Sequence, residues 1–167
     1  MSPRILVAGI GNVFFGDDGF GVEVANRLAG VPMPDGVRVV EYGIRGVHLA
    51  YELLDGYDAL VLIDAMPLGE APGTVAIVEP DVGELGAGDD VAPTIDAHTM
   101  HPAIVLATLA NLGGEVGRVV IVGCEPATLS DGMGLSAPVA EAVDRAIEAV
   151  GEVLEELCGT RVKESRT

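Results

Sequence analysis

Three side chains, Asp18, Asp64 and His98, are the strongest candidates for chemistry in this sequence. Asp18 follows a glycine-rich turn, Asp64 ends an apolar run, and His98 lies shortly before Pro102, which is well placed to begin a helix. Two neighbouring carboxylates need a cation or a shared proton, and histidine is the commonest metal-binding side chain. If these groups meet in the fold, they suit Zn, Mn, Fe or Ni, among which affinity alone does not choose.

Each candidate also has an ordinary structural explanation. Asp17 or Asp18 can cap a helix N-terminus, although one carboxylate is enough for that role. Asp64 can simply end its strand, and a lone histidine is more often structural than a ligand. His101 competes with His98 as the imidazole ligand. The metal-site hypothesis therefore depends on the three side chains converging at one place.

A nucleotide site is the first alternative. Gly9 and Gly11 have the spacing of a dinucleotide-binding fingerprint, but Phe14 stands where the third glycine belongs. Asp17 and Asp18 would also repel a pyrophosphate. We therefore expect no nucleotide cofactor.

A side-chain nucleophile is the second alternative. The sequence has neither the His-Glu-x-x-His zinc protease signature nor the Gly-x-Ser-x-Gly nucleophile elbow. Ser136 looks like the N-cap of the final helix, and Cys124 looks like a thiol at a strand end. With Cys158 as the second and distant cysteine, we expect both thiols to be reduced and no disulfide scaffold.

Charge and hydropathy exclude several classes of partner. The 167 residues include 9 basic and 26 acidic side chains, for a net charge of −17. A chain without a cationic surface is poorly suited to nucleic acid or to anionic membranes. We see no signal peptide, and no apolar stretch reaches the roughly 18–20 residues that a membrane span needs. We expect a soluble, cytoplasmic protein.

Apolar runs alternate with segments of helical spacing along the chain. A continuous apolar run indicates a strand that is buried on both faces of a parallel sheet. The alternation of such runs with helical segments predicts an α/β fold. The predicted strands are residues 4–10, 37–42, 59–64 and 119–123, and the predicted helices are 21–28, 47–54, 102–112 and 137–158.

The segment 74–79 follows its neighbouring strand too closely for a crossover helix, so we predict an antiparallel edge strand there. The prediction is a three-layer αβα sandwich with a mostly parallel, twisted sheet of about five strands. Residues 1–159 form one domain and residues 160–167 a polar tail. The acidic, glycine-rich segment 80–97 is expected to be a mobile flap or a substrate-contacting loop. His48 is expected to be a partly buried packing residue on a helix.

Ligands of open parallel sheets bind outside the carboxyl ends of the strands, where the three candidate side chains are expected to lie. At this point the sequence resembles the hydrogenase maturation proteases. The resemblance covers nearly the whole chain. The motifs that carry it are Gly9-x-Gly11-Asn12, Asp17-Asp18-Gly19-x-Gly21-Val22, Ile63-Asp64-Ala65, Pro72-Gly73-Thr74, His98, and Val122-Gly123-Cys124-Glu125-Pro126 through Gly134-Leu135-Ser136.

The resemblance implies an endopeptidase that removes the C-terminal extension of a nickel-iron hydrogenase large-subunit precursor after nickel insertion. It implies that Asp18, Asp64 and His98 contact nickel and form the catalytic site, and that the substrate supplies this nickel. Substrate-binding roles are expected for Asn12, Asp17, Glu41 and Gly43. Glu41 stands where relatives usually carry Asp, and Ile44 stands where many carry Thr.

A mechanism follows as a hypothesis. The metal polarises the scissile carbonyl or lowers the pKa of a water, and the carboxylate of Asp17 or Asp18 relays a proton. This is aspartic-type endopeptidase chemistry without a serine or cysteine nucleophile. The alternative function is a non-catalytic nickel-binding chaperone or accessory module that uses the same three ligands.

Overall fold

The computed structural model describes residues 2–80 and 102–165, with side chains described as far as residue 159. Five strands form one sheet in the order β2-β1-β3-β5-β4. All neighbouring strands are parallel except β4 and β5, which are antiparallel at one edge. The strands are β1 (Ile5–Ile10), β2 (Val37–Gly43), β3 (Ala59–Ala65), β4 (Val75–Val78) and β5 (Arg118–Cys124).

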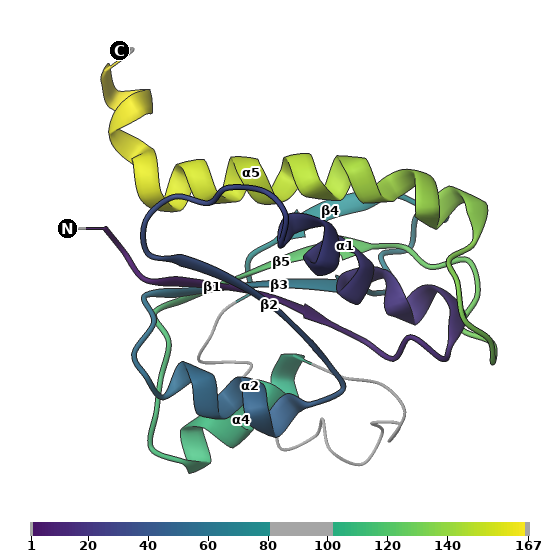
Figure 1. The fold of residues 1–167 in the computed structure, drawn as a ribbon, viewed down its shortest axis with the longest axis horizontal. Helices are drawn as coiled ribbons and strands as arrows, with labels where there is room; N and C mark the ends of the chain where they lie inside the picture. Colours follow the sequence, from purple (N-terminus) through teal and green to yellow (C-terminus); the bar gives the residue numbers. More distant parts are fainter. Residues whose placement is uncertain (1, 81–101, 166–167) are drawn as a thin grey trace.

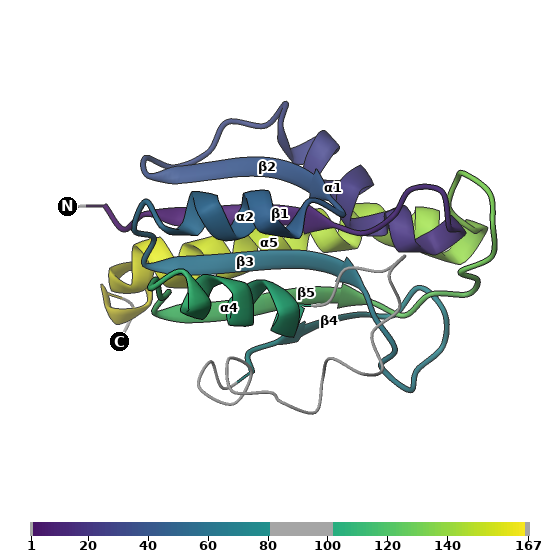
Figure 2. The same ribbon diagram turned by 90° about the horizontal axis from the view of Figure 1, so that it is seen from below.

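Helices cover both faces of this sheet, which makes three layers. The helices are the short 3-10 helix η1 (Gly16–Gly19), α1 (Phe20–Leu28), α2 (Gly46–Leu53), α4 (Pro102–Asn111) and α5 (Ala137–Ser165). Figure 1 shows α1 and α5 on one side of the sheet and α2 and α4 on the other. Viewed from below, α2 and α4 lie side by side across β1, β3 and β5 (Figure 2).

Two hydrophobic cores explain the layers. Alternate side chains of β1 point to opposite faces, so Ile5 and Val7 pack in the core beneath α1 and α5. Leu6 and Ala8 pack in the second core with α2 and α4. Every residue of β1 is buried, which is the burial expected from a continuous apolar run in a parallel sheet.

The predicted architecture is confirmed, including the antiparallel edge strand β4. Predicted strand and helix ends lie within a few residues of the observed ones, except at the C-terminal end of α5. That helix continues to Ser165 through a non-helical residue, Gly159, with φ −117° and ψ 27°. The helix therefore enters the segment expected to be a tail, and the division at residue 159 stays a prediction.

One packing prediction is wrong. His48 does lie on α2, but its side chain is exposed. The buried face of α2 is filled instead by Leu49, Ala50 and Leu53, which lie one, two and five positions further along the helix. The predicted flap at 80–97 lies almost entirely outside the described residues. None of the helices in the described part of the chain is long and apolar enough to cross a membrane.

Candidate active site

Asp18 and Asp64 lie at the carboxyl edge of the sheet, where neighbouring strands β1 and β3 end. Gly9 pairs with Ile63 in these parallel strands, so the chain after β1 and the last residues of β3 reach the same edge. Asp64 is the next-to-last residue of β3, and Asp18 is in η1, which contacts β3. Each side chain is only 5% exposed. We call these two residues the acid pair.

The acid pair is short of hydrogen-bond donors. Within the described residues, Oδ1 of Asp64 is buried and has no hydrogen-bond partner. Burial and then the charge of Asp18 raise the pKa of the Asp64 carboxyl well above its ordinary value, against a smaller lowering effect of the Ala65 backbone N–H. Such a buried acceptor is costly unless a cation or a proton accompanies it.

Asp18 has one strong partner on its own loop. The backbone N–H of Asn12 donates to Oδ2 of Asp18 at 2.6 Å. Burial nevertheless raises the pKa of Asp18, because its effect exceeds the lowering effect of this hydrogen bond. Two carboxyls with raised pKa values at one sheet edge form an environment suited to a divalent cation or to proton transfer.

The third predicted ligand is not placed. His98 and its rival His101 lie outside the described residues. Among the residues that are described, no three His, Cys, Asp or Glu side chains gather as a metal-binding group. The structure therefore brings together two of the three predicted ligands, and the complete set stays a prediction.

Asp17 has a different role from its neighbour. Its side chain is fully buried, and both carboxylate oxygens accept hydrogen bonds from residues 127–136. The backbone N–H of Ala127 donates at 2.8 Å and that of Thr128 at 3.1 Å. Ser136 donates from its backbone N–H at 2.7 Å and from its hydroxyl at 2.8 Å.

These four hydrogen bonds decide the charge state of Asp17. Burial has the largest single effect and raises the pKa of Asp17, but the donors of Ser136, Ala127 and Thr128 together outweigh it and lower the pKa. Asp17 is thus ionised, and it links its own loop to residues 127–136. We call this set of four hydrogen bonds the Asp17 clasp. Asp17 is not a helix cap, because the N-cap positions of η1 and α1 are Phe15 and Gly19. Direct contact of Asp17 with a substrate stays a prediction.

The partners of Asp17 are site residues that sequence reasoning missed. Ser136 does directly precede α5, as expected for an N-cap, yet its hydroxyl donates to Asp17. Glu125 was also missed. Its side chain accepts hydrogen bonds from the backbone N–H groups of Leu68 and Glu70, in the loop that follows Asp64. The family resemblance marks this closing segment, but no pattern in the sequence pairs it with particular partners.

Of the remaining predicted substrate residues, Glu41 and Gly43 lie at the end of β2, and Asn12 follows the neighbouring end of β1. Gly43 has φ +59°, and its carbonyl accepts a hydrogen bond from Gly11 at 3.0 Å. Glu41 is half-buried and pairs with Arg45 at 3.7 Å. Asn12 accepts a hydrogen bond from the Phe14 backbone at 2.9 Å. Their position beside the acid pair's edge agrees with a substrate-facing role, which stays a prediction.

The glycines of the first motif permit close packing at this edge. A Cβ on Gly21 would overlap the carbonyl of Ile63, so α1 approaches β3 directly. Gly11 has φ +133°, and a Cβ there would overlap the carbonyl of Asp18. The space at Gly11 is thus filled by the segment that carries Asp18.

The free thiol nearest to these loops, Cys124, is a poor nucleophile. It lies buried at the end of β5, as expected. Burial, followed by the charge of Asp17, raises the pKa of Cys124 to about 11. A thiol rather than a thiolate is therefore present at neutral pH.

An open, mostly parallel sheet with a buried acid pair at its carboxyl edge defines an α/β protein with an acidic candidate site. Comparison with known proteins defines it further. The chain belongs to the hydrogenase maturation protease family, whose model matches residues 22–153. It is accordingly an endopeptidase of that family. Its structural neighbours include a hydrogenase maturating endopeptidase and a hydrogenase maturation protease.

The relatives match over most of their length. A provisionally assigned hydrogenase maturation protease of Methanocaldococcus jannaschii is 39% identical, over 89% of this chain and 96% of the relative. The hydrogenase expression/formation protein HupD of Rhizobium leguminosarum is 34% identical, over 92% of this chain and 75% of the relative. The hydrogenase maturating endopeptidase HybD from E. coli superposes with a TM-score of 0.75 at 29% identity, covering 92% of this chain and 93% of HybD.

Proposed function

We propose that this protein removes the C-terminal extension of a nickel-iron hydrogenase large-subunit precursor after nickel insertion. Membership of the hydrogenase maturation protease family supports the reaction class. The observation that carries the nickel requirement is the acid pair, in which Oδ1 of Asp64 is buried without a partner among the described residues. An incoming cation supplies the missing interaction.

In this proposal nickel belongs to the substrate. Asp18 and Asp64 offer two oxygen ligands, and His98 adds an imidazole nitrogen. The remaining coordination positions are left to groups of the precursor, so the protease grips only a large subunit that already holds its metal. Specificity then arises because the productive arrangement forms only with the completed substrate.

The proton transfer is assigned to the acid pair rather than to Asp17. Burial raises the pKa values of both Asp18 and Asp64 in the metal-free protein, and a bound cation would lower them again, so a carboxylate oxygen of either residue would serve as the proton acceptor. Asp17 is held ionised by four donors, so it positions the loop instead. Nickel bound to the acid pair polarises the scissile carbonyl or activates a water.

Processing of purified precursor tests this function. The protein is mixed with a nickel-loaded large-subunit precursor, and mass spectrometry follows the loss of the C-terminal extension. We expect a shortened subunit with the wild type, none with Asp64→Asn, and none when the precursor lacks nickel. Asp35→Asn is the matched control, since Asp35 is exposed on the connection between α1 and β2 and should leave processing unchanged.

The same experiment separates the alternative of a non-catalytic nickel chaperone. A chaperone would bind or transfer nickel and leave the mass of the precursor unchanged. An unchanged mass with correctly loaded precursor would therefore overturn the peptidase proposal. The proposal assigns the reaction to the cytoplasm, as expected from the sequence.

A further inference from the structure

Two loops beside the acid pair are joined into one surface. The Gly132 backbone N–H donates to the Phe14 carbonyl at 2.8 Å, and the Gly16 N–H donates to the Gly132 carbonyl at 2.8 Å. The Asp17 backbone N–H donates to the Thr128 carbonyl at 3.0 Å. Together with the Asp17 carboxylate, these bonds fix residues 127–136 against residues 12–19. We call the two joined segments the loop platform.

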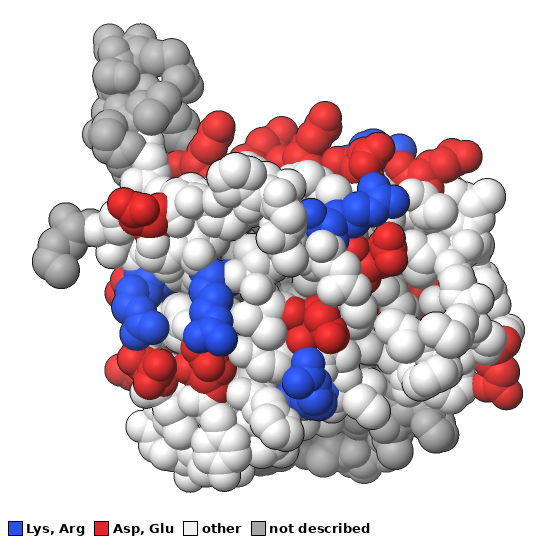
Figure 3. Space-filling view, viewed as in Figure 1, with Lys and Arg blue, Asp and Glu red and all other residues white. Residues whose placement is uncertain are grey.

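The loop platform exposes apolar side chains. Phe14 is 61% exposed, Met133 is 71% exposed and Leu129 is 47% exposed. The loop platform lies at the right-hand end of the molecule in Figure 1, and Figure 3 shows few charged groups there, whereas acidic side chains crowd along α5. In a chain with a net charge of −17, apolar side chains gathered at one end indicate a contact surface.

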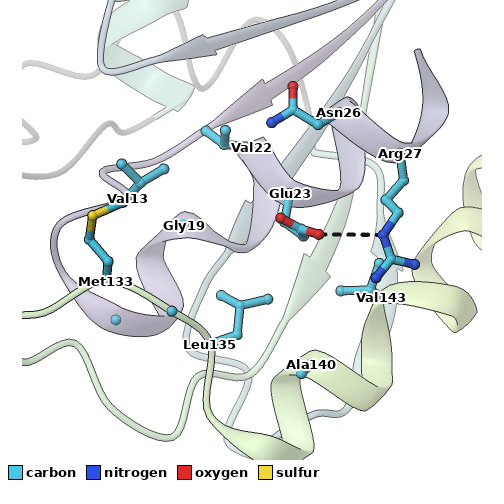
Figure 4. A pocket seen from close by; sticks show the side chains of 12 residues that line it. Val13, Gly19, Val22, Glu23, Asn26, Arg27, Met133, Leu135, Ala140 and Val143 are labelled. Carbon is cyan, nitrogen blue, oxygen red and sulfur yellow. Dashed lines mark hydrogen bonds and ion pairs between the residues drawn. The ribbon is translucent and has the colours of Figure 1, made fainter. Parts of the chain in front are cut away.

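A pocket opens beside the loop platform. It lies between the loop platform, α1 and α5, and its volume is about 640 Å³. Figure 4 shows Val13 and Met133 together at one end and the Glu23–Arg27 ion pair, 3.3 Å long, at another part of the wall. A wall that combines apolar side chains with Glu23, Asn26 and Arg27, in a volume of this size, suits a short peptide stretch.

The pocket is continuous with the acid-pair loop. Gly16 and Gly19 line the pocket, and in the sequence they directly flank Asp17 and Asp18. The short helix η1 thus carries both Asp18 of the acid pair and two glycines of the pocket wall.

We propose, resting on the function proposed above, that the loop platform and this pocket dock an extended, apolar segment of the same hydrogenase precursor. An acid pair gripping one metal ion provides little contact area, whereas protein recognition depends on a few apolar anchors at the centre of an interface. Phe14 and Met133 are such anchors. An aliphatic side chain of the precursor enters between Val13 and Leu135, and Asn26 and the Glu23–Arg27 pair face its backbone groups.

The hydrogen bonds of the Asp17 side chain fit this role. That side chain is fully buried and is hydrogen-bonded to Ala127, Thr128 and Ser136. The four hydrogen bonds of Asp17 hold the segment that carries Leu129 and Met133 in place before a partner arrives. A surface that is ordered in advance loses less conformational entropy on binding.

The test is steady-state processing of nickel-loaded precursor by the double variant Phe14→Ser, Met133→Gln. We expect KM to rise roughly tenfold or more with kcat little changed, because the anchors contribute to binding and not to the chemical step. Val31→Gln is the matched control. Val31 is 44% exposed on the connection between α1 and β2, near the amino ends of the strands, and should leave KM unchanged.

A second measurement locates the contact directly. A photoreactive p-benzoylphenylalanine replacing Phe14 should cross-link to the purified precursor, and the same group replacing Val31 should not. If the wild type processes precursor while the double variant keeps the wild-type KM and position 14 gives no cross-link, the docking proposal fails and the proposed function stands. If the wild type cleaves nothing, the proposed function fails.

The same variants also test folding and self-association. Thermal unfolding of the double variant should match that of the wild type, since both side chains are exposed. If it does not, the cross-link alone decides. A cross-link to a second copy of the chain, together with a change of oligomeric state in the double variant, would assign the loop platform to self-association and overturn the proposal.

Discussion

Burial and then the negative charge of Asp18 raise the pKa of Asp64, although Asp18 and Asp64 belong to different elements and are far apart in the sequence. Parallel pairing of β1 with β3 brings the ends of both strands to one edge, and η1 then folds back over β3. The result is a pair of like charges held in the protein without a compensating cation among the described residues. Such an arrangement costs stability, and it is the basis of the cation site proposed above.

Asp64→Asn should stabilise the metal-free protein at pH 7 by about 1 kcal/mol, the scale of gains from relieving a strained functional site. The folded-state pKa of Asp64 lies above the ordinary value of 3.8, so the folded protein binds more protons than the unfolded chain between these two values. The free energy of unfolding of the wild type therefore falls as pH rises through this window. The amide of the variant avoids that loss.

Urea unfolding of both proteins at a series of pH values measures this difference. The advantage of Asp64→Asn should disappear as the pH falls below 3.8, where the carboxyl is protonated in both states. Added nickel should stabilise the wild type and not the variant. A variant less stable than the wild type at pH 7 would show that Asp64 is already well compensated in the metal-free protein.

Asp17→Ala should destabilise the protein by about 2–4 kcal/mol, since it strands several buried donors of residues 127–136. Ser136→Ala removes only the hydroxyl donor and should cost about 1 kcal/mol. Equilibrium urea unfolding compares the two variants. Equal and small losses in both would mean that the Asp17 clasp contributes little to holding the loops together.

The clasp also has a pH signature of the opposite sign to that of Asp64. The pKa of Asp17 is lowered in the folded state, so its contribution is present above the ordinary value of 3.8 and is lost as the pH falls below it. The stability difference between wild type and Asp17→Ala should therefore shrink on acidification. A difference that grows at low pH would contradict an ionised clasp.

Gly21→Ala should destabilise the protein by about 1–3 kcal/mol, because the added methyl overlaps the carbonyl of Ile63 and pushes α1 away from β3. Gly151→Ala is the matched control. Gly151 also lies inside a helix, but a Cβ there meets nothing within 4 Å, so the substitution should stabilise by about 0.4–1 kcal/mol. Thermal unfolding of the two variants should shift in opposite directions. A shift of both in the same direction would show that the approach of α1 to β3 is not tight.

His98→Ala should abolish processing of the nickel-loaded precursor and leave the thermal transition nearly unchanged, because the proposed role of His98 is that of a metal ligand. His101→Ala should have a milder effect. The mass-spectrometric assay of precursor cleavage measures both. If the two effects are exchanged, His101 is the imidazole ligand and the assignment of His98 is wrong.

The layers of this fold follow from local patterns in the sequence. The continuous apolar runs at 5–10 and 59–63 require cover on both faces, and the intervening helical periodicity supplies it. The short gap before β4 excludes a crossover helix, so even the antiparallel edge was predictable. Asp18 and Asp64 were predictable as neighbours because both follow buried parallel strands.

Asp17 shows where sequence reasoning stops. Two adjacent aspartates look equivalent in the chain, and capping, substrate contact or proton relay suits either of them. Only the fold distinguishes them, since η1 aims the two side chains at different surroundings. Asp17 meets four donors from residues 127–136, whereas Asp18 meets Asn12 and the charge of Asp64.

The sequence by itself determined the sheet, its helical layers and the edge at which acidic side chains collect, because burial periodicity and connection length are local properties. The tertiary structure decided which carboxylate is a clasp, which pair lacks a partner, and where exposed apolar side chains adjoin a pocket. These three features depend on contacts between segments that are distant in the chain. Such contacts produce no regular spacing of residues from which they could be predicted.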